Sequence, residues 1–230
     1  LLNKDNINYA IFVQNGLALN FTNDYKSLEQ AYSKAKFILS VSSHINNCIR
    51  VAFPNHKNKI IQINQSVRQQ KLNFNAKTKL ITYMPRKLPD HSKLVLFFLR
   101  NHLPKGWKIL PIDNISQENV FKYLKKSKIF LSFSNLEGFG LPPLEAATLG
   151  NVVIGYTGEG GAEYWHNPIF KKIEQGNILD FVKKINIIIN KKLDYASIRN
   201  HRKKLLKKYS PTNEKKKIVR MLNIIKKIYN

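Results

Sequence analysis

Seven short apolar runs constrain the fold of this chain more than any other feature of its sequence. Each run is five or six residues long and is rich in Ile, Val, Leu or Phe. The runs lie at residues 9–13, 37–41, 59–63, 79–83, 107–112, 128–133 and 151–155. Continuous apolar runs of this length are typical of strands buried on both faces, and strands that alternate with helices form parallel sheets. The sequence therefore predicts an α/β fold, with Rossmann-like parallel sheets covered by helices.

The segments between the runs predict helices and a division into two domains. Apolar residues recur at helical spacing from Ser27 to Lys36, and Ser116 is placed as the N-cap of a helix that ends at Lys126. Further helices are expected at 90–101, 142–149, 177–192, 194–209 and 212–229, with one or two helical turns at 45–50. The polar stretch 64–77 lacks periodicity and predicts a linker. We expect a partial first domain over residues 1–63, a second domain over 78–193 and C-terminal helices over 194–230.

The net charge of +25 comes from 32 lysines far more than from the seven arginines. Proteins that read bases favour arginine, and no nucleic-acid-binding motif occurs, so a specific nucleic-acid partner is not predicted. The densest basic runs, at residues 202–208 and 215–217, fall in the C-terminal helices. They indicate either a solvated helix face or a surface that binds an anionic membrane.

A single cysteine, Cys48, cannot form an internal disulfide or a metal-binding cysteine cluster, which fits a reducing compartment. No stretch approaches the roughly 20 apolar residues of a membrane span, and the first residues do not resemble a signal peptide. We therefore expect a cytoplasmic protein, or one that lies peripherally on the inner membrane surface.

The segment from Ser134 to Ala147 is the main candidate site, because it joins a predicted strand to a predicted helix through two glycines. Ligands of parallel sheets bind beside the carboxyl ends of the strands. Gly138 and Gly140 allow a ligand to approach the backbone, and a helix N-terminus favours an anion such as a diphosphate. Glu137 and Glu145 would repel that anion unless they bind hydroxyl groups, for example those of a sugar. The alternative is that Glu145 caps its helix and Glu137 lies on the surface.

The stretch Glu137-Gly138-Phe139-Gly140-Leu141-Pro142-Pro143-Leu144-Glu145-Ala146, with two glutamates separated by seven residues, resembles a known motif. It is similar to the donor-site motif of retaining glycosyltransferases with the GT-B fold, and most similar to their large family four, the glycosyl transferases group 1. The resemblance extends to residues 150–155 and the glycine turn 158–161, and also to Phe37 through Ser43. It covers most of the chain from about residue 37 to 190.

The resemblance implies roles for individual residues of the donor site. Glu137 would bind hydroxyls of the donor sugar, and Glu145 would bind the ribose of the nucleotide. Backbone contacts to the sugar and the phosphates would come from Gly138, Phe139, Gly140 and Leu141. The second domain would thus bind a nucleotide-diphosphate sugar, and the first domain would bind the acceptor.

The same resemblance places a basic pair after the first strand of the donor domain, where this chain has Arg86 and Lys87. The two cations would stabilise the leaving diphosphate without a metal or another cofactor. Their adjacency departs from the wider spacing usual in the family, so Lys87 can equally be a solvated lysine. Glu163, which follows the glycine turn, is interpreted as a donor contact or a helix cap. Asn15 and Ser43, at strand ends of the first domain, would face the cleft from the acceptor side.

We therefore expect a glycosyltransferase that moves a sugar, with retention, to a hydroxyl of a polysaccharide or lipid-linked glycan. The alternatives are a non-catalytic nucleotide-sugar-binding module and a basic protein that binds membrane surfaces or nucleic acid. About 63 residues precede the linker, roughly half of what a first GT-B domain needs, and the last helix of such proteins often packs back on that domain. A fragment of a longer enzyme is the favoured explanation. A reduced protein that needs a partner and a donor-binding remnant are the others.

Overall fold

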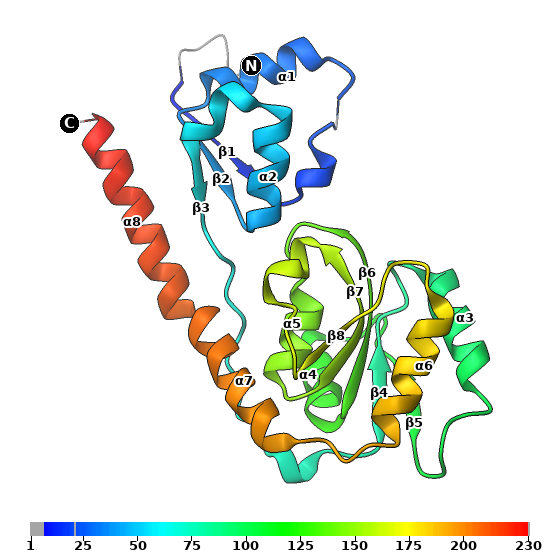
Figure 1. Ribbon diagram of the computed structural model, residues 1–230. Coiled ribbons are helices and arrows are strands. Elements are labelled where there is room, and N and C mark those ends of the chain that lie inside the picture. Colours follow the sequence, from blue (N-terminus) through cyan, green and yellow to red (C-terminus); the bar gives the residue numbers. More distant parts are fainter. Residues whose placement is uncertain (1–6, 21, 230) are drawn as a thin grey trace.

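The computed structural model describes residues 7–20 and 22–229 and contains two parallel sheets (Figure 1). The first sheet has the order β1-β2-β3, and each strand pairs in parallel with the next. Its strands are β1 (Ala10–Val13), β2 (Phe37–Ser40) and β3 (Ile60–Gln62). The helices of this first unit are α1 (Tyr25–Lys34) and α2 (Ser43–Ala52), with short 3-10 turns η1 (Gly16–Ala18) and η2 (Pro54–Lys59).

The second sheet has the order β5-β4-β6-β7-β8 and is also parallel throughout. Its strands are β4 (Leu80–Tyr83), β5 (Lys108–Pro111), β6 (Ile129–Glu137), β7 (Val152–Glu159) and β8 (Phe170–Lys172). The helices of this second unit are α3 (Pro89–Leu99), α4 (Gln117–Lys126), α5 (Leu141–Thr148) and α6 (Ile178–Ile189), and the 3-10 turn η4 (Gly160–Tyr164) follows β7. The predicted fold class, Rossmann-like parallel sheets with helices, is confirmed.

The core of the second unit shows why apolar runs marked its strands. The β6 run from Ile129 to Phe133 is buried, and Phe133 stacks on Phe181 of α6 at a centroid distance of 5.0 Å. Gly155 of β7 has a φ of +135°, and a Cβ there would lie 2.1 Å from the Ser132 carbonyl oxygen. The close approach of the two central strands therefore requires glycine at this position.

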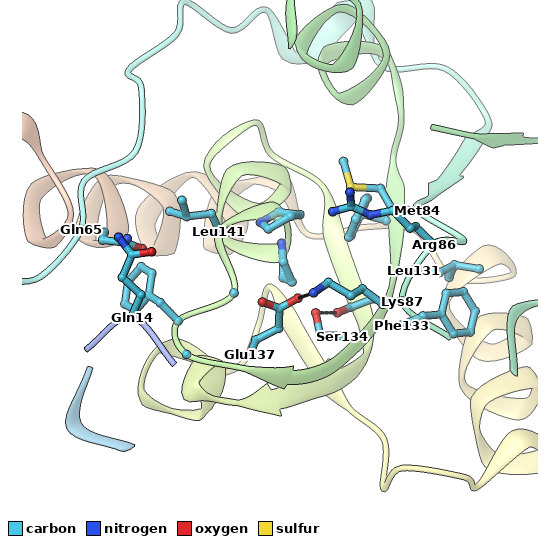
Figure 2. A pocket seen from close by; sticks show the side chains of 17 residues that line it. Gln14, Gln65, Met84, Arg86, Lys87, Leu131, Phe133, Ser134, Glu137 and Leu141 are labelled. Atoms are coloured by element: carbon cyan, nitrogen blue, oxygen red, sulfur yellow. Dashed lines mark hydrogen bonds and ion pairs between the residues drawn. The ribbon is translucent and has the colours of Figure 1, made fainter. Parts of the chain in front are cut away.

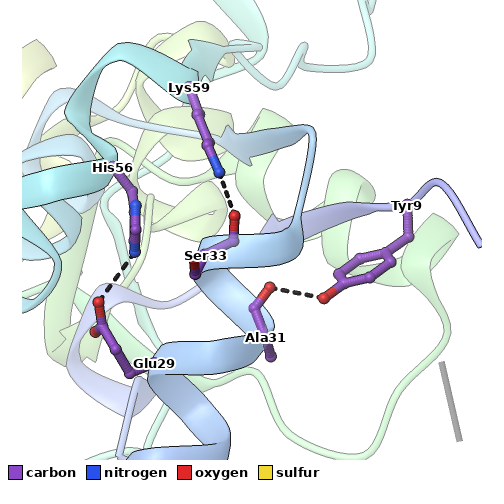
Figure 3. Close-up of polar contacts among 6 residues, drawn as sticks. All are labelled: Tyr9, Glu29, Ala31, Ser33, His56 and Lys59. Carbon is purple, nitrogen blue, oxygen red and sulfur yellow. Dashed lines mark hydrogen bonds and ion pairs between the residues drawn. The ribbon is translucent and has the colours of Figure 1, made fainter. Parts of the chain in front are cut away.

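Polar contacts hold helix α1 of the first unit to the segment before β1 and to η2 (Figure 3). The Tyr9 hydroxyl, just before β1, donates to the carbonyl oxygen of Ala31 in α1 at 2.8 Å. His56 of η2 contacts the Glu29 carboxylate at 3.0 Å, and Lys59 donates to the Ser33 carbonyl. These contacts fix α1 between two segments that are distant from it in sequence.

Residues 63–79 join the two units and are bound along the second one. Lys77, 9% exposed, donates to three carbonyl oxygens: Leu124 at 3.0 Å, Ser127 at 2.7 Å and Leu149 at 2.6 Å. Part of the segment forms η3 (Phe74–Ala76). The assignment of 64–77 as a linker between separate domains stays a prediction.

Two helices, α7 (Tyr195–Lys208) and α8 (Pro211–Tyr229), end the described chain. Arg202 of α7 donates to the carbonyl oxygens of Thr148 in α5 (2.6 Å) and Gln70 (3.2 Å). Figure 1 shows α8 extending past the joining segment, and Glu214 and Lys217 contact Ser66 and Asn64 there.

Further along α8, apolar side chains including Val219 and Leu222 are 46% exposed. Within residues 7–20 and 22–229, no helix has the length and apolar character needed to cross a bilayer. Association of the basic helices with a membrane surface, and packing of α8 on the first unit, stay predictions.

The structure differs from the sequence-based elements in four main places, and one of them is strand β7, which continues past its expected end at residue 155 to Glu159. The short strand β8 was not predicted, because only Phe170 of its three residues is buried and Lys171 and Lys172 break the apolar pattern. The helix α2 spans ten residues where one or two turns were expected, with Ser42 as its N-cap. Strand β6 continues to Glu137, so the segment expected to be a loop from Ser134 begins as strand.

Candidate functional site

A cavity of about 340 Å³ opens at the carboxyl end of β4 and β6, where a parallel sheet is expected to bind its ligand. Its walls come from the segment after β4, from β6, and from the turn and first residues of α5. Gln14 of the first unit and Gln65 of the joining segment complete it from the opposite side (Figure 2). The cavity therefore lies between the two units.

The turn between β6 and α5 has the unusual backbone that its glycines suggested. Gly140 has a φ of +78° and is the N-cap of α5. Its carbonyl oxygen accepts a hydrogen bond from the Tyr164 hydroxyl of η4. Pro142 and Pro143 lack an N–H, so the first turn of α5 presents fewer donors to an anion than most helices do. The helix dipole remains, and the cations opposite it supply further attraction.

Lys87 and Glu137 form an ion pair across the cavity, with Nζ and Oε1 3.2 Å apart (Figure 2). Arg86 lies on the same side and is exposed. In the part of the chain that the structure describes, Arg86 makes no ion pair with an acidic side chain. Two cations and a carboxylate thus face one cavity, which suits a ligand with both phosphate and hydroxyl groups.

The first unit contacts the end of β6 and the β6–α5 turn directly. Asn15 Nδ2 donates to the Leu136 carbonyl oxygen at 2.8 Å. The buried Ser42 hydroxyl donates to the Gly138 carbonyl oxygen at 2.7 Å. A Cβ at Gly138 would fall 1.7 Å from the Gln14 carbonyl oxygen. The backbone of the first unit at Gln14 therefore leaves room only for glycine at position 138.

Comparison with known proteins identifies the second unit. Residues 99–208 match the family described as Glycosyl transferases group 1, and this range includes the whole β6–α5 turn. The chain contains a group 1 glycosyltransferase domain. Two curated viral proteins also match short segments of it. "Putative glycosyltransferase 41" of Sulfolobus islandicus filamentous virus is 46% identical over 44 residues, which is 19% of this chain and 13% of that protein. "Putative glycosyltransferase ORF330" of Acidianus filamentous virus 2 is 36% identical over 55 residues, 24% and 17% of the two chains.

Solved structures share the fold of the whole chain, the glycosyltransferase domain included. A mutant of S. aureus TarM, in complex with Fondaparinux, alpha-GlcNAc-glycerol and UDP, has a TM-score of 0.73 at 18% identity over 96% of this chain and 52% of its own. The pneumococcal O-GlcNAc transferase GtfA, in complex with UDP and GlcNAc, has a TM-score of 0.67 at 14% identity, with 97% and 53% covered. Anabaena HepE in complex with UDP and glucose has a TM-score of 0.71 at 12% identity, with 94% and 71% covered. The chain thus spans about half the length of TarM and GtfA.

Glu145 of the glycosyltransferase domain lies in the second turn of α5, not in the first turn as expected, because the helix begins one residue early at Leu141. Its side chain does not line the cavity. Burial raises the pKa of the Glu145 carboxyl from 4.5 to about 7. Its predicted contact with a ribose stays a prediction.

The raised pKa of Glu145 predicts a pH dependence of stability. Above about pH 4.5 the Glu145 carboxyl loses its proton in the unfolded chain but keeps it in the folded state. The contribution of the protonated carboxyl to stability is therefore complete below pH 4.5 and is lost as the pH rises through about 7. The test compares the free energy of unfolding of the wild type with that of Glu145→Gln. We expect the difference, wild type minus variant, to fall by on the order of 1–3 kcal/mol between pH 4.5 and 7.5. Urea unfolding of both proteins at the two pH values measures it. A difference that stays constant with pH would contradict the prediction.

Glu163 of the domain joins the two units and does not line the cavity. Its carboxylate accepts hydrogen bonds from the Ser43 backbone N–H (2.9 Å) and hydroxyl (3.0 Å), from Asn64 (3.3 Å) and from Tyr209 (3.2 Å). Ser43 is the first residue of α2, so Glu163 also lies where the α2 dipole favours an anion. Its predicted donor contact and the predicted acceptor roles of Asn15 and Ser43 stay predictions. In this structure all three hold the units together.

Of the other predicted donor-site residues, the cavity is lined by Arg86, Lys87, Glu137, Gly138, Phe139, Gly140 and Leu141. Gln14, Gln65 and Met84 line it too, and none of them was predicted as a site residue, although Gln14 and Met84 directly follow the predicted strands 9–13 and 79–83. Gln14 directly follows β1, so its position at a strand end was the available signal. Gln65 lies in a polar segment without periodicity, and nothing in the sequence distinguished it. Within the described residues, no three His, Cys, Asp or Glu side chains gather as metal ligands.

Proposed function

We propose that the cavity binds a UDP-sugar and that the protein to which this chain belongs transfers the sugar to a hydroxyl acceptor. The observation that carries the proposal is the convergence of Arg86, Lys87 and Glu137 on one cavity beside the N-terminus of α5. Cations and a helix dipole suit a diphosphate, and a carboxylate suits sugar hydroxyls. The group 1 family match supports the reaction class, and UDP in the TarM, GtfA and HepE structures supports the choice of nucleotide.

In the proposed reaction the bond from the anomeric carbon to the diphosphate oxygen breaks, and a bond to the acceptor oxygen forms on the same face of the sugar. The departing diphosphate oxygen, on the same face of the sugar, takes the proton of the acceptor hydroxyl, and negative charge develops on the diphosphate as the bond to the sugar breaks. Arg86 and Lys87 stabilise that charge as it grows. Glu137 positions the sugar through its hydroxyls. The acceptor is a polysaccharide or a lipid-linked glycan.

UDP binding tests the role of the two cations. The diphosphate competes for Lys87, which is half-exposed in its pair with Glu137 and is therefore easily released. Arg86→Ala and Lys87→Ala are each expected to weaken UDP binding about tenfold or more, because each removes a charge-assisted hydrogen bond. Lys93→Ala is the matched control, since Lys93 pairs with Asp90 on the exposed side of α3.

Calorimetric titration with UDP, GDP and ADP measures these affinities and the preference for the base. Failure of the wild-type chain to bind UDP, or an equal loss of affinity in Lys93→Ala, would overturn the proposal. Turnover of the bound UDP-sugar with a hydroxyl acceptor, followed by NMR of the new anomeric centre, then tests transfer and retention.

A non-catalytic nucleotide-sugar-binding module is the second candidate. The observation that favours it for this chain is the small first sheet, which has three strands among the described residues against five in the second. Saturable UDP-sugar binding without transfer or slow donor hydrolysis would support it.

A further inference from the structure

Residues 136–138, where the irregular end of β6 turns toward α5, carry Glu137 and are held in place by two side chains of the first unit. The carbonyl oxygens of Leu136 and Gly138, on either side of Glu137, accept hydrogen bonds. Their donors are Asn15 Nδ2 (2.8 Å) and Ser42 Oγ (2.7 Å) respectively. Leu136 has a φ of +48°, a conformation that side-chain-bearing residues adopt uncommonly. The turn is therefore in a shape that its own sequence does not favour, and the contacts from outside help to keep it.

Neighbouring backbone also leaves little free space around this turn. A Cβ at Gly138 would overlap the Gln14 carbonyl, and a Cβ at Gly160 would lie 2.1 Å from the Gly138 carbonyl oxygen. The peptide after Glu137 thus lies between β1 of the first unit and η4 of the second. A shift of the first unit moves the backbone from which the Glu137 carboxylate extends.

We propose that Asn15 and Ser42 are positioning residues for the donor sugar, acting through the 136–138 turn to direct Glu137 into the cavity. This inference rests on the proposed function. It makes the first unit part of the donor site, in addition to any contact with the acceptor. The affinity for the sugar portion of the donor then depends on the contact between the units.

Asn15 can be altered at the contact with little change elsewhere, whereas Ser42 has a second role in α2. Asn15 Oδ1 accepts a hydrogen bond from the Leu17 N–H at 3.0 Å, while Nδ2 donates to Leu136. Asn15→Asp keeps the acceptor and replaces the donor by an oxygen that repels the carbonyl. Ser42 also caps α2 by accepting from the Ile45 N–H at 3.2 Å, so Ser42→Ala removes both a cap and the bond to Gly138.

Ser116→Ala is the matched control for Ser42→Ala. Ser116 caps α4 through the Asn119 N–H and has no part in the cavity. Both substitutions remove a helix cap, and only Ser42→Ala also leaves the buried Gly138 carbonyl without its partner. Ser42→Thr retains a hydroxyl and tests rescue.

The experiment measures the dissociation constants of UDP and UDP-glucose, and their ratio gives the contribution of the sugar. For Asn15→Asp and Ser42→Ala we expect the ratio of UDP to UDP-glucose constants to fall about tenfold, with UDP itself bound within about twofold of the wild type. Ser116→Ala and Ser42→Thr are expected to keep the wild-type ratio. Amide hydrogen exchange of residues 136–141 without ligand is expected to accelerate in the first two variants only.

The outcomes separate this inference from the proposed function. A wild type that binds UDP-glucose no more tightly than UDP argues against the sugar site itself, and this inference is overturned with it. A wild type with a clear preference for UDP-glucose, retained in Asn15→Asp and Ser42→Ala, overturns the positioning role alone. An equal loss in Ser116→Ala would mean that helix stability is responsible, and it would also overturn the inference.

Discussion

Replacing Lys77 by methionine is expected to lower the free energy of unfolding by about 2–6 kcal/mol, because two buried carbonyl oxygens lose their donors at a cost of roughly 1–3 kcal/mol each. The side chain reaches the C-terminal ends of α4 and α5, where carbonyl oxygens have no partner inside the helix. Methionine fills the volume and donates nothing. The carbonyl of Leu124 keeps a bond from Asn151, whereas the side-chain donors to Ser127 and Leu149 are lost.

Thermal unfolding at pH 6 measures the effect of Lys77→Met. Burial, and to a lesser degree the charge of Arg202, lower the pKa of Lys77 to about 7, so at pH 6 the wild-type side chain is an ammonium with three N–H donors. The expected free-energy change corresponds to a fall in Tm of roughly 4–24 °C for a chain of this size. Lys71→Met, at an exposed lysine of the same joining segment, is the control. A Tm for Lys77→Met equal to that of the control would show that the three contacts contribute nothing.

Glu137→Ala is expected to separate binding of the nucleotide from binding of the sugar. The substitution removes a carboxylate that would accept hydrogen bonds from sugar hydroxyls, each worth about 1.5–3 kcal/mol when one partner is charged. Transfer from a UDP-sugar should therefore fall at least 100-fold. The same substitution releases Lys87 from its 3.2 Å ion pair, which leaves that cation free for the diphosphate. UDP alone should then bind as tightly as to the wild type, or a few-fold more tightly.

The control for this prediction is Glu174→Ala, which removes a carboxylate from an exposed pair with Lys172, outside the cavity. Calorimetry with UDP and a turnover assay with the UDP-sugar give the two measurements. Weaker binding of UDP by Glu137→Ala would mean that the carboxylate holds Lys87 in its working position. Unchanged turnover would remove Glu137 from the donor site.

The strands that form the core were predictable because their sequence is locally unambiguous. The β6 run from Ile129 to Phe133 is apolar at nearly every position, and its burial on both faces needs no knowledge of its neighbours. The turn after it was also recognisable, since Gly140 has a left-handed backbone that few other residues adopt. The position of the cavity and its charged residues could therefore be predicted from the local sequence alone.

Contacts between distant segments account for what the sequence did not reveal. Glu163 looked like a donor contact because it follows a glycine turn, yet its hydrogen-bond partner Ser43 is 120 positions away. Ser42 was only one of the polar residues after the predicted strand 37–41, and its bond to Gly138 depends on how the two units meet. Lys77 looked like one of many lysines. Its burial follows from the way α4 and α5 end side by side, which no pattern near residue 77 encodes.

The segment that joins the two units also restricts how such a protein can recombine during evolution. Val67 bonds to the Tyr209 carbonyl at 3.0 Å, Gln70 accepts from Lys125 and Arg202, and Lys77 ends buried beneath two helices. A crossover just before residue 64 would exchange the first unit and leave this set of contacts intact. A crossover inside the segment would inherit half of it from each parent, and the contacts with α4 and α7 would no longer match. We therefore expect exchange of the first unit between related chains to preserve these contacts only when the crossover lies before residue 64.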